Sequence, residues 1–289
     1  MKKSNKILII FGLSLILIPL GVMIYEAKAN YTDEKGFAAE ETKRANEDAS
    51  FATPSKDMES QSIASAFTSI NIEDAKKMGL SIHYVKSAEY GIKVSKSQKD
   101  SIGFKVDANG QLQVSFKNGS EGRDHNYVSI LVYAPSMKQL NVKNVKALFV
   151  NAKVDSLSLN VNQSASISFD KDAVIQHLDI NADAVENVNA WESKIANLKL
   201  KLNNSNFTST RSSYEQLAIS TMGTAKIELS GDNEEKTKNT IKQLILETKD
   251  VAEVKLMNIA VANCSGSLSD QTQVQMPALN LNQLYKVKK

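Results

Sequence analysis

The stretch that decides the fold is LSLNVNQSASISFDKDAVIQHLDINADAVENVNAWESKIANLKL, residues 157–200. It contains three pairs of aliphatic residues whose members are separated by one residue, and such pairs recur outside it. In chain order the pairs are Leu140/Val142, Leu157/Leu159, Leu178/Ile180, Leu198/Leu200, Leu217/Ile219, Leu244/Leu246 and Leu279/Leu281. Successive pairs begin 17, 21, 20, 19, 27 and 35 residues apart, so the first four intervals lie near twenty residues.

A second apolar position follows each of the first six pairs, ten residues after the pair begins. These positions are Val150, Ile167, Val188, Thr208, Ile227 and Val254. Five of the six are aliphatic, and Phe207 directly precedes the exception. Two short strands at a fixed separation, repeated about every twenty residues, are typical of a β-solenoid.

In such a fold each coil lies parallel to the preceding one, about 4.8 Å further along the axis. One coil cannot bury its own apolar pair, so stacking must provide the burial. We therefore predict an all-β fold whose residues 140–289 form a right-handed parallel β-helix or β-solenoid-like stack. The alternative is an ordinary β-sandwich with regularly spaced strands, but few turn dipeptides such as Asn-Gly lie between the pairs.

The two long intervals have separate interpretations. The 27-residue interval contains the charged stretch Gly231–Lys238, which we interpret as a surface loop inserted into one coil. The 35-residue interval is long enough to hold an extra coil around Leu256 to Leu268.

Residues 61–139 show a different pattern, in which apolar and polar residues alternate over short runs. The runs are Phe67–Ile72, Leu80–Tyr84, Tyr90–Val94, Ile102–Val106 and Leu112–Phe116, followed by Tyr127–Ala134. Alternation with a period of two indicates strands with one buried and one solvated face. We predict that this block forms an antiparallel or mixed β-layer that heads the repeats.

The N-terminus carries an uncharged apolar segment, residues 7–25, preceded by Lys2, Lys3 and Lys6. Its length suits a transmembrane helix. Residues 31–60 hold eight acidic against four basic residues, and this asymmetry predicts that residues 1–6 are cytoplasmic and the rest lies outside. We interpret residues 26–60 as an acidic flexible stalk. Ala27-Lys28-Ala29 resembles a signal peptidase site, so secretion after cleavage following Ala29 remains the alternative to a membrane anchor.

The strand patterns from Phe67 to Val142 resemble those of a known family. The blocks that carry the likeness are Phe67–Ile70, Tyr90–Val94, Ile102–Val106, Gly110–Val114 and Tyr133–Leu140. In these blocks the chain resembles the head GIN domain family of Bacteroidetes envelope proteins, auto-transporter adhesins in which the last element leads into the repeating part. The resemblance implies an adhesin-like function.

The turns depart from the pattern of this family, whose members place Gly and Ser after the strand pairs. Here Asn and Lys dominate, as in Asn144–Ala147 and Asn160–Asn162. Because Asn tolerates the left-handed conformation and can stack in hydrogen-bonded ladders, we expect the geometry to survive.

The charged and reactive residues suggest no chemistry. The net charge of +3 is small and the basic residues are scattered, so no nucleic-acid partner is expected. The single cysteine, Cys264, cannot form an internal disulfide, and we favour a small buried residue over a reactive thiol or an intermolecular bridge. The histidines, His83, His125 and His177, lack zinc-site spacing. We expect His83 to face solvent from a strand and His177 to lie at a coil corner.

The acids Asp170, Asp172, Asp179 and Asp183 allow one enzymatic alternative. Parallel β-helices include polysaccharide lyases whose carboxylates hold calcium. An exposed, solvated turn is the favoured interpretation, because Lys171 partly neutralises its two neighbours. We therefore predict no catalytic, cofactor-binding or metal-binding residues, no cofactor and no enzymatic activity.

The function expected from the sequence is that of an exported, membrane-anchored envelope protein. It would contact the membrane through residues 7–25 and act as an adhesin-like or structural module with a protein or glycan ligand. Two alternatives remain open: a carbohydrate-active β-helix enzyme and a membrane-tethered scaffolding or regulatory partner.

Overall fold

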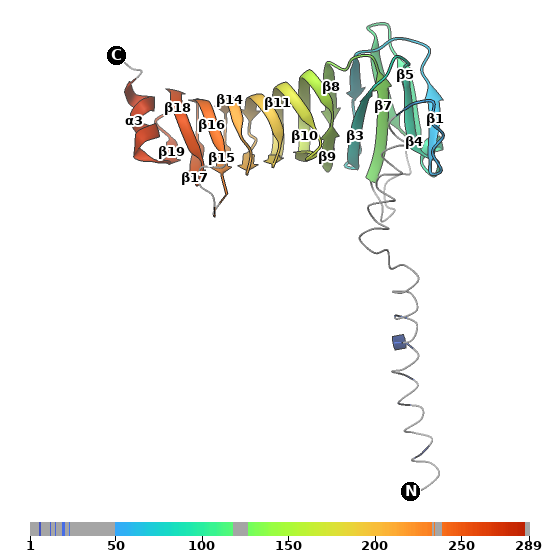
Figure 1. Ribbon diagram of the computed structural model, residues 1–289, viewed down its shortest axis with the longest axis horizontal. Helices are drawn as coiled ribbons and strands as arrows, with labels where there is room; N and C mark the ends of the chain where they lie inside the picture. Colours follow the sequence, from blue (N-terminus) through green and yellow to red (C-terminus); the bar gives the residue numbers. More distant parts are fainter. Residues whose placement is uncertain are drawn as a thin grey trace. The chain divides into compact units, whose positions relative to one another are not determined.

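The computed structural model describes residues 50–117, 127–232, 234 and 239–286, together with Lys6, Gly12, Leu15, Pro19, Leu20 and Met23. The chain divides into two compact units, Met1–Asp48 and Ala49–Lys289, and the following description concerns the second. Its described residues form a mixed sheet of 19 strands and end in the helix α3 (Ala278–Lys286), as Figure 1 shows.

The first seven strands form a head with both parallel and antiparallel pairing. They are β1 (Met58–Ser62), β2 (Ser69–Ile72), β3 (Gly79–Lys86), β4 (Gly91–Ser95), β5 (Ile102–Val106), β6 (Gln111–Phe116) and β7 (Tyr127–Ala134), with a 3-10 turn at Lys99–Ser101. The pairs β1–β4, β4–β7 and β5–β6 are antiparallel, whereas β2–β6 and β3–β7 are parallel.

The remaining twelve strands form the repeats and, in the described residues, pair with one another only in parallel. They are β8 (Gln139–Lys143), β9 (Ala147–Asn151), β10 (Lys153–Phe169), β11 (Val174–Trp191), β12 (Lys194–Asn203), β13 (Phe207–Thr210), β14 (Tyr214–Met222), β15 (Ala225–Ser230), β16 (Thr240–Thr248), β17 (Ala252–Met257), β18 (Ala260–Ser267) and β19 (Thr272–Gln275). Head and repeats share one sheet, because β2 pairs with β8 and β3 with β9.

The pairing register places apolar side chains in buried rows. In one row Leu157, Leu178, Leu198, Leu217 and Leu244 lie opposite one another in turn. In a second row the successive members are Leu148, Ile167, Val188, Phe207, Ile227 and Val254, all of them buried. The second row confirms the predicted positions Ile167, Val188, Ile227 and Val254. At the other two positions the prediction was wrong, because Leu148 rather than Val150 and Phe207 rather than Thr208 belong to the row.

Two details of the predicted spacing differ from the structure, and the extra coil expected in the 35-residue interval is found. Leu140 lies opposite Leu159, so the first interval is two residues longer than the spacing of the pairs indicates. The 35-residue interval holds the strand β18, in which Cys264 lies opposite Leu244. The pair Leu279/Leu281 belongs to α3 instead of a strand, because Pro277 directly precedes the helix and its carbonyl accepts the first helical hydrogen bonds.

The predicted fold class is wrong in the form given above. In the described residues, the strands do not form an all-β right-handed parallel β-helix. They form one mixed sheet in which antiparallel head strands and parallel repeats are continuous, and the helix α3 follows them. The described residues include no helix long and apolar enough to cross a membrane. Apart from five positions, the predicted membrane segment 7–25 lies outside the described residues.

The predicted stalk also ends earlier than expected. The strand β1 (Met58–Ser62) includes the last three residues of the predicted 26–60 stalk, and the residues just before β1 are held on the head. The buried Lys93 donates hydrogen bonds from Nζ to the carbonyls of Ser50 (2.8 Å) and Thr53 (2.9 Å), while Phe51 packs against Tyr133. Residues 31–49 lie outside the described residues.

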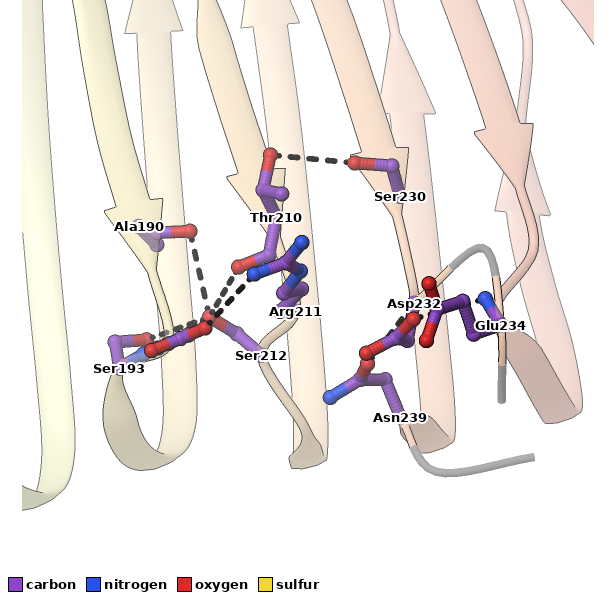
Figure 2. A network of polar contacts seen from close by, with 10 residues as sticks. Ala190, Ser193, Thr210, Arg211, Ser212, Ser230, Asp232, Glu234 and Asn239 are labelled. Carbon is purple, nitrogen blue, oxygen red and sulfur yellow. Dashed lines mark hydrogen bonds and ion pairs between the residues drawn. The ribbon is translucent and has the colours of Figure 1, made fainter. Parts of the chain in front are cut away.

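The corners of the repeats, which lie between strands or within the long strand β10, share one local arrangement. A residue with positive φ is followed by a buried serine in Gln163-Ser164, Glu192-Ser193, Asn204-Ser205 and Arg211-Ser212. The hydroxyls of Ser164, Ser205 and Ser212 each accept a hydrogen bond from a backbone amide of the preceding repeat, for example Val185 N to Ser205 Oγ at 2.9 Å. Figure 2 shows the equivalent contact between Ser193 and Ser212. Each buried amide at these turns thus gains an acceptor, as burial requires.

The helix α3 covers the free backbone edge of β18. Asn280 donates to the carbonyl of Val261 (3.0 Å) and Gln283 to that of Ala262 (3.0 Å), while the Gln283 side-chain oxygen accepts from the amide of Cys264 (2.9 Å). An uncovered strand edge invites pairing with another chain. The side-chain amides of α3 therefore form the hydrogen bonds with β18 that the backbone of a further strand would form.

Two leucines begin equivalent apolar pairs in the sequence, but the buried rows predict that they contribute very differently to the free energy of unfolding. Leu217 is fully buried, whereas Leu279 is 67% exposed. We expect Leu217→Ala to lower the free energy of unfolding by about 2–5 kcal/mol through a cavity, and Leu279→Ala to change it by less than about 0.5 kcal/mol. Urea denaturation of both variants checks this, and equal losses would contradict the register.

The contacts of α3 with β18 predict that two asparagines of this helix contribute differently to the stability of the chain. Asn280 is buried against β18 and Asn282 is exposed. Removing the Asn280 amide leaves the Val261 carbonyl without its donor, so Asn280→Ala should cost about 1–3 kcal/mol. Asn282→Ala should be nearly neutral, since it loses no such contact. Thermal unfolding, with light scattering to detect self-association through the exposed edge, measures both; indistinguishable variants would show that α3 does not cap the sheet.

Candidate functional site

An open groove of about 930 Å³ runs along the C-terminal ends of β2, β8, β12 and β14 and crosses the middle of the long strands β10 and β11. Two lines of outward side chains border it. The amide row consists of Asn71, Asn141, Asn160 and Asn181 and continues to Lys201 and Ser220. The second row, two residues further along each strand, consists of Lys143, Asn162, Asp183, Asn203 and Met222.

Both rows exist because successive repeats pair in register. Side chains two residues apart on a strand share a face, so each outward residue lies beside its counterpart in the next repeat. The residue between the two rows points inward, and Val142, Val161, Ala182 and Leu202 are buried there. The groove therefore has a polar rim supported from beneath by the apolar core.

Hydrogen bonds connect neighbouring side chains along the amide row. Asn160 Nδ2 donates to Asn141 Oδ1 and Asn181 Nδ2 donates to Asn160 Oδ1, both at 2.7 Å. Gln139 adds a donor to Asn141 Oδ1 at 2.9 Å. These contacts form an Asn ladder within the strands β8, β10 and β11, rather than at the turns where such ladders were expected, and they fix the orientation of each amide.

The second row is organised around a carboxylate. Asp183 Oδ2 accepts from Asn162 (2.9 Å) and Asp183 Oδ1 accepts from Asn203 (2.6 Å). Each oxygen thus has one amide donor, and the two hydrogen bonds hold the carboxylate in place.

The charges of the groove are three lysines against two carboxylates. Lys143, Lys201 and Lys249 line it together with Glu73 and Asp183. Within the described part of the chain, none of these lysines forms an ion pair. Beside one end of the groove, the Lys76 backbone amide and the Asn144 side chain donate to Asp74 and hold the pKa of that carboxyl below its usual value.

Of the four acids considered above, only Asp183 lies in the groove. Asp170 accepts from the backbone amide of Asp172 in a turn, and Asp179 lies outward on β11 beside Lys199. Within the described ranges, no group of three or more His, Cys, Asp or Glu side chains is placed to hold a metal ion. The carboxylates are therefore not brought together into the arrangement that the calcium alternative requires.

The histidines lie apart from the groove where they are described. His83 Nε2 lies 2.7 Å from Ser81 Oγ on β3. His177 is exposed within β11, opposite Asn197, so the prediction that it lies at a corner is wrong. His125 lies outside the described residues.

The groove itself was not predicted from the sequence, although the sequence contains a signal for it. Asn141, Asn160 and Asn181 recur at intervals of 19 and 21 residues. They directly follow Leu140, Leu159 and Ile180, which lie opposite one another in the sheet. This recurrence indicates the row only once the pairing register is known.

Comparisons with known proteins give one family and several structures. The family described as "Putative auto-transporter adhesin, head GIN domain" matches residues 66–243. A putative adhesin from Parabacteroides distasonis is 14% identical, with a TM-score of 0.45, and the match covers 76% of this chain and 92% of that one. A putative adhesin from Bacteroides fragilis is 15% identical, with a TM-score of 0.43 and coverage of 76% and 94%. No curated protein matches the chain.

Cys264 is buried, as predicted, and this burial should slow the alkylation of its thiol. Burial raises the pKa of the Cys264 thiol to about 11. Since the thiolate is the reactive form, we expect iodoacetamide to alkylate the folded chain far more slowly at pH 8.5 than the urea-unfolded chain. The rate for the folded chain should keep rising up to about pH 11. Mass spectrometry follows the reaction, and equal rates for the two states would contradict the buried position.

Proposed function

The chain belongs to the head GIN domain family, and from this premise we propose that it is an exported, non-enzymatic envelope protein that binds another surface through the groove. The family description supports an adhesin-like role. The observation that carries the proposal is the amide row, in which Asn141, Asn160 and Asn181 are held in one line by hydrogen bonds.

The side chains of the groove suit binding better than catalysis. Amide groups donate and accept hydrogen bonds but do not exchange protons near neutral pH. The ammonium groups of Lys143, Lys201 and Lys249 add attraction for negative charge. A hydrolytic site of the usual kind pairs an acid with a base, whereas the carboxylate of Asp183 is held by two amides.

The location we propose rests on the N-terminal sequence. Residues 7–25 are uncharged and follow three lysines, which favours export of everything after them. The segment either keeps the chain at the membrane or is removed after Ala29. In both cases the groove would face the cell envelope or the medium.

The proposal predicts that removing three asparagines of the amide row weakens binding to envelope material. The test variant is Asn141→Ala/Asn160→Ala/Asn181→Ala in the full chain, and the probe is the isolated cell-envelope fraction of the source bacterium. We expect binding, measured by co-sedimentation, to fall at least about tenfold, since one hydrogen bond to a ligand contributes about 1 kcal/mol and three donors are lost.

A matched control uses the hydrogen-bonded pair Asn187 and Asn189 on β11. Neither lines the groove, so Asn187→Ala/Asn189→Ala should bind envelope material as the unchanged chain does. The proposal fails if the unchanged chain does not sediment with the envelope fraction, or if both variants lose binding equally.

A further inference from the structure

We propose that the groove binds an extended acidic polysaccharide, whose hydroxyls are recognised by the amide row and whose negative groups are recognised by Lys143, Lys201 and Lys249. This inference rests on the proposed binding function and names the chemical class of its ligand. Four features of the groove lead to it: its unused hydrogen-bonding groups, its regular spacing, its charge and its lack of a free strand edge.

The amide row keeps hydrogen-bonding groups for a ligand after its internal contacts are made. An Asn side chain has two N–H donors and an oxygen with two lone pairs. Asn141 Oδ1 accepts two hydrogen bonds, and within the described part of the chain no protein group takes the N–H groups of that amide. Asn160 uses one donor and one lone pair and retains one of each. The ladder therefore presents oriented donors and acceptors in a line.

The spacing of these groups is that of the strands. Adjacent paired strands lie about 4.7–4.9 Å apart, so equivalent amides repeat at this distance along the groove. Sugar rings in an extended chain repeat at a similar length and carry several hydroxyls each. One amide can thus meet hydroxyls of one sugar residue, and its counterpart in the next repeat can meet those of the next residue.

The lysines add a requirement for negative charge. Lys143 lies in β8, Lys201 in β12 and Lys249 just after β16, so they are distributed along the groove. None forms an ion pair within the described residues, although Lys143 lies near enough to Asp74 to contribute to the lowered pKa of that carboxyl. A polymer with carboxylate or sulfate groups at intervals can contact all three, whereas a neutral polymer leaves them unmatched.

A peptide strand fits the groove less well. Peptides commonly bind a sheet by pairing with a free strand edge, but β10, β11 and β12 already pair on both sides. The rim also offers few apolar pockets for side chains, since Met222 is the large apolar residue exposed on it. The groove must therefore recognise its ligand through polar side chains.

The test measures binding of the full chain to dextran, dextran sulfate, polygalacturonate and poly-L-glutamate by isothermal titration. We expect dextran sulfate and polygalacturonate to bind at least tenfold more tightly than dextran and poly-L-glutamate. Their affinity should fall as salt rises from 50 to 400 mM, because salt screens exposed charges.

Two variants with the same net charge distinguish binding in the groove from non-specific electrostatic attraction to the whole protein. Lys143→Gln/Lys201→Gln/Lys249→Gln removes the groove lysines, and Lys105→Gln/Lys171→Gln/Lys194→Gln removes three exposed lysines elsewhere. The first should lose at least tenfold in affinity for both acidic polysaccharides, and the second should lose less than twofold.

Each other outcome overturns the inference in a distinguishable way. Equal binding of dextran shows that charge is not recognised, and equal binding of poly-L-glutamate shows that hydroxyls are not. Equal losses in the two lysine variants place the binding outside the groove. If no polysaccharide binds while envelope sedimentation persists, the ligand class is wrong and the proposed function stands; if envelope sedimentation also fails, both are wrong.

Discussion

The groove depends on one constraint, the parallel, in-register pairing of backbones between successive repeats. Along each strand the side chains alternate between the core and the outer face. Pairing of Leu159 with Ile180 brings Asn160 beside Asn181 and Val161 beside Ala182. A shift of one residue would exchange the two faces of the strand. It would then bury amides and expose aliphatic residues, so the core and the amide row are set by the same register.

The turns keep this register constant from repeat to repeat. Residues with positive φ, such as Asn144, Ala184 and Asn204, bend the chain at equivalent places, and buried serines satisfy the backbone amides beneath them. The resemblance to the family leads one to expect glycine at these corners, but Asn144, Ala184 and Asn204 occupy three of them, and Gly223 occupies the equivalent corner after β14. The longer connection between β15 and β16 leaves the pairing of Leu217 with Leu244 intact, because the added residues lie between strands.

Much of the fold was predictable from the sequence because burial leaves a periodic pattern. Most of the second buried row, the burial of Cys264 and the resemblance to the family that matches residues 66–243 are confirmed. The end of the chain was not, because Leu279 and Leu281 fit the apolar spacing while Pro277 and the lack of a further strand favour a helix. The predicted β-helix was wrong for a related reason. Apolar periodicity indicates where strands lie, but it does not indicate that head strands pair with the repeats in one mixed sheet.

The groove was hidden because its residues are ordinary in sequence. An outward Asn reads only as a polar strand residue, and Lys143, Lys201 and Lys249 are separated by 58 and 48 positions. Only the register shows that the asparagines touch and that the lysines share one face. Chemistry that arises from a repeated surface therefore needs the pairing pattern before it can be recognised.

The most direct measurement of the central claim observes the asparagine side chains themselves. In the full chain labelled with ¹⁵N at asparagine, the side-chain amide resonances of Asn141, Asn160 and Asn181 can be followed while polygalacturonate is added. The account predicts that these three shift together and that those of Asn187 and Asn189 stay in place. Shifts confined to Asn187 and Asn189, or binding without any change in the three groove resonances, would contradict it.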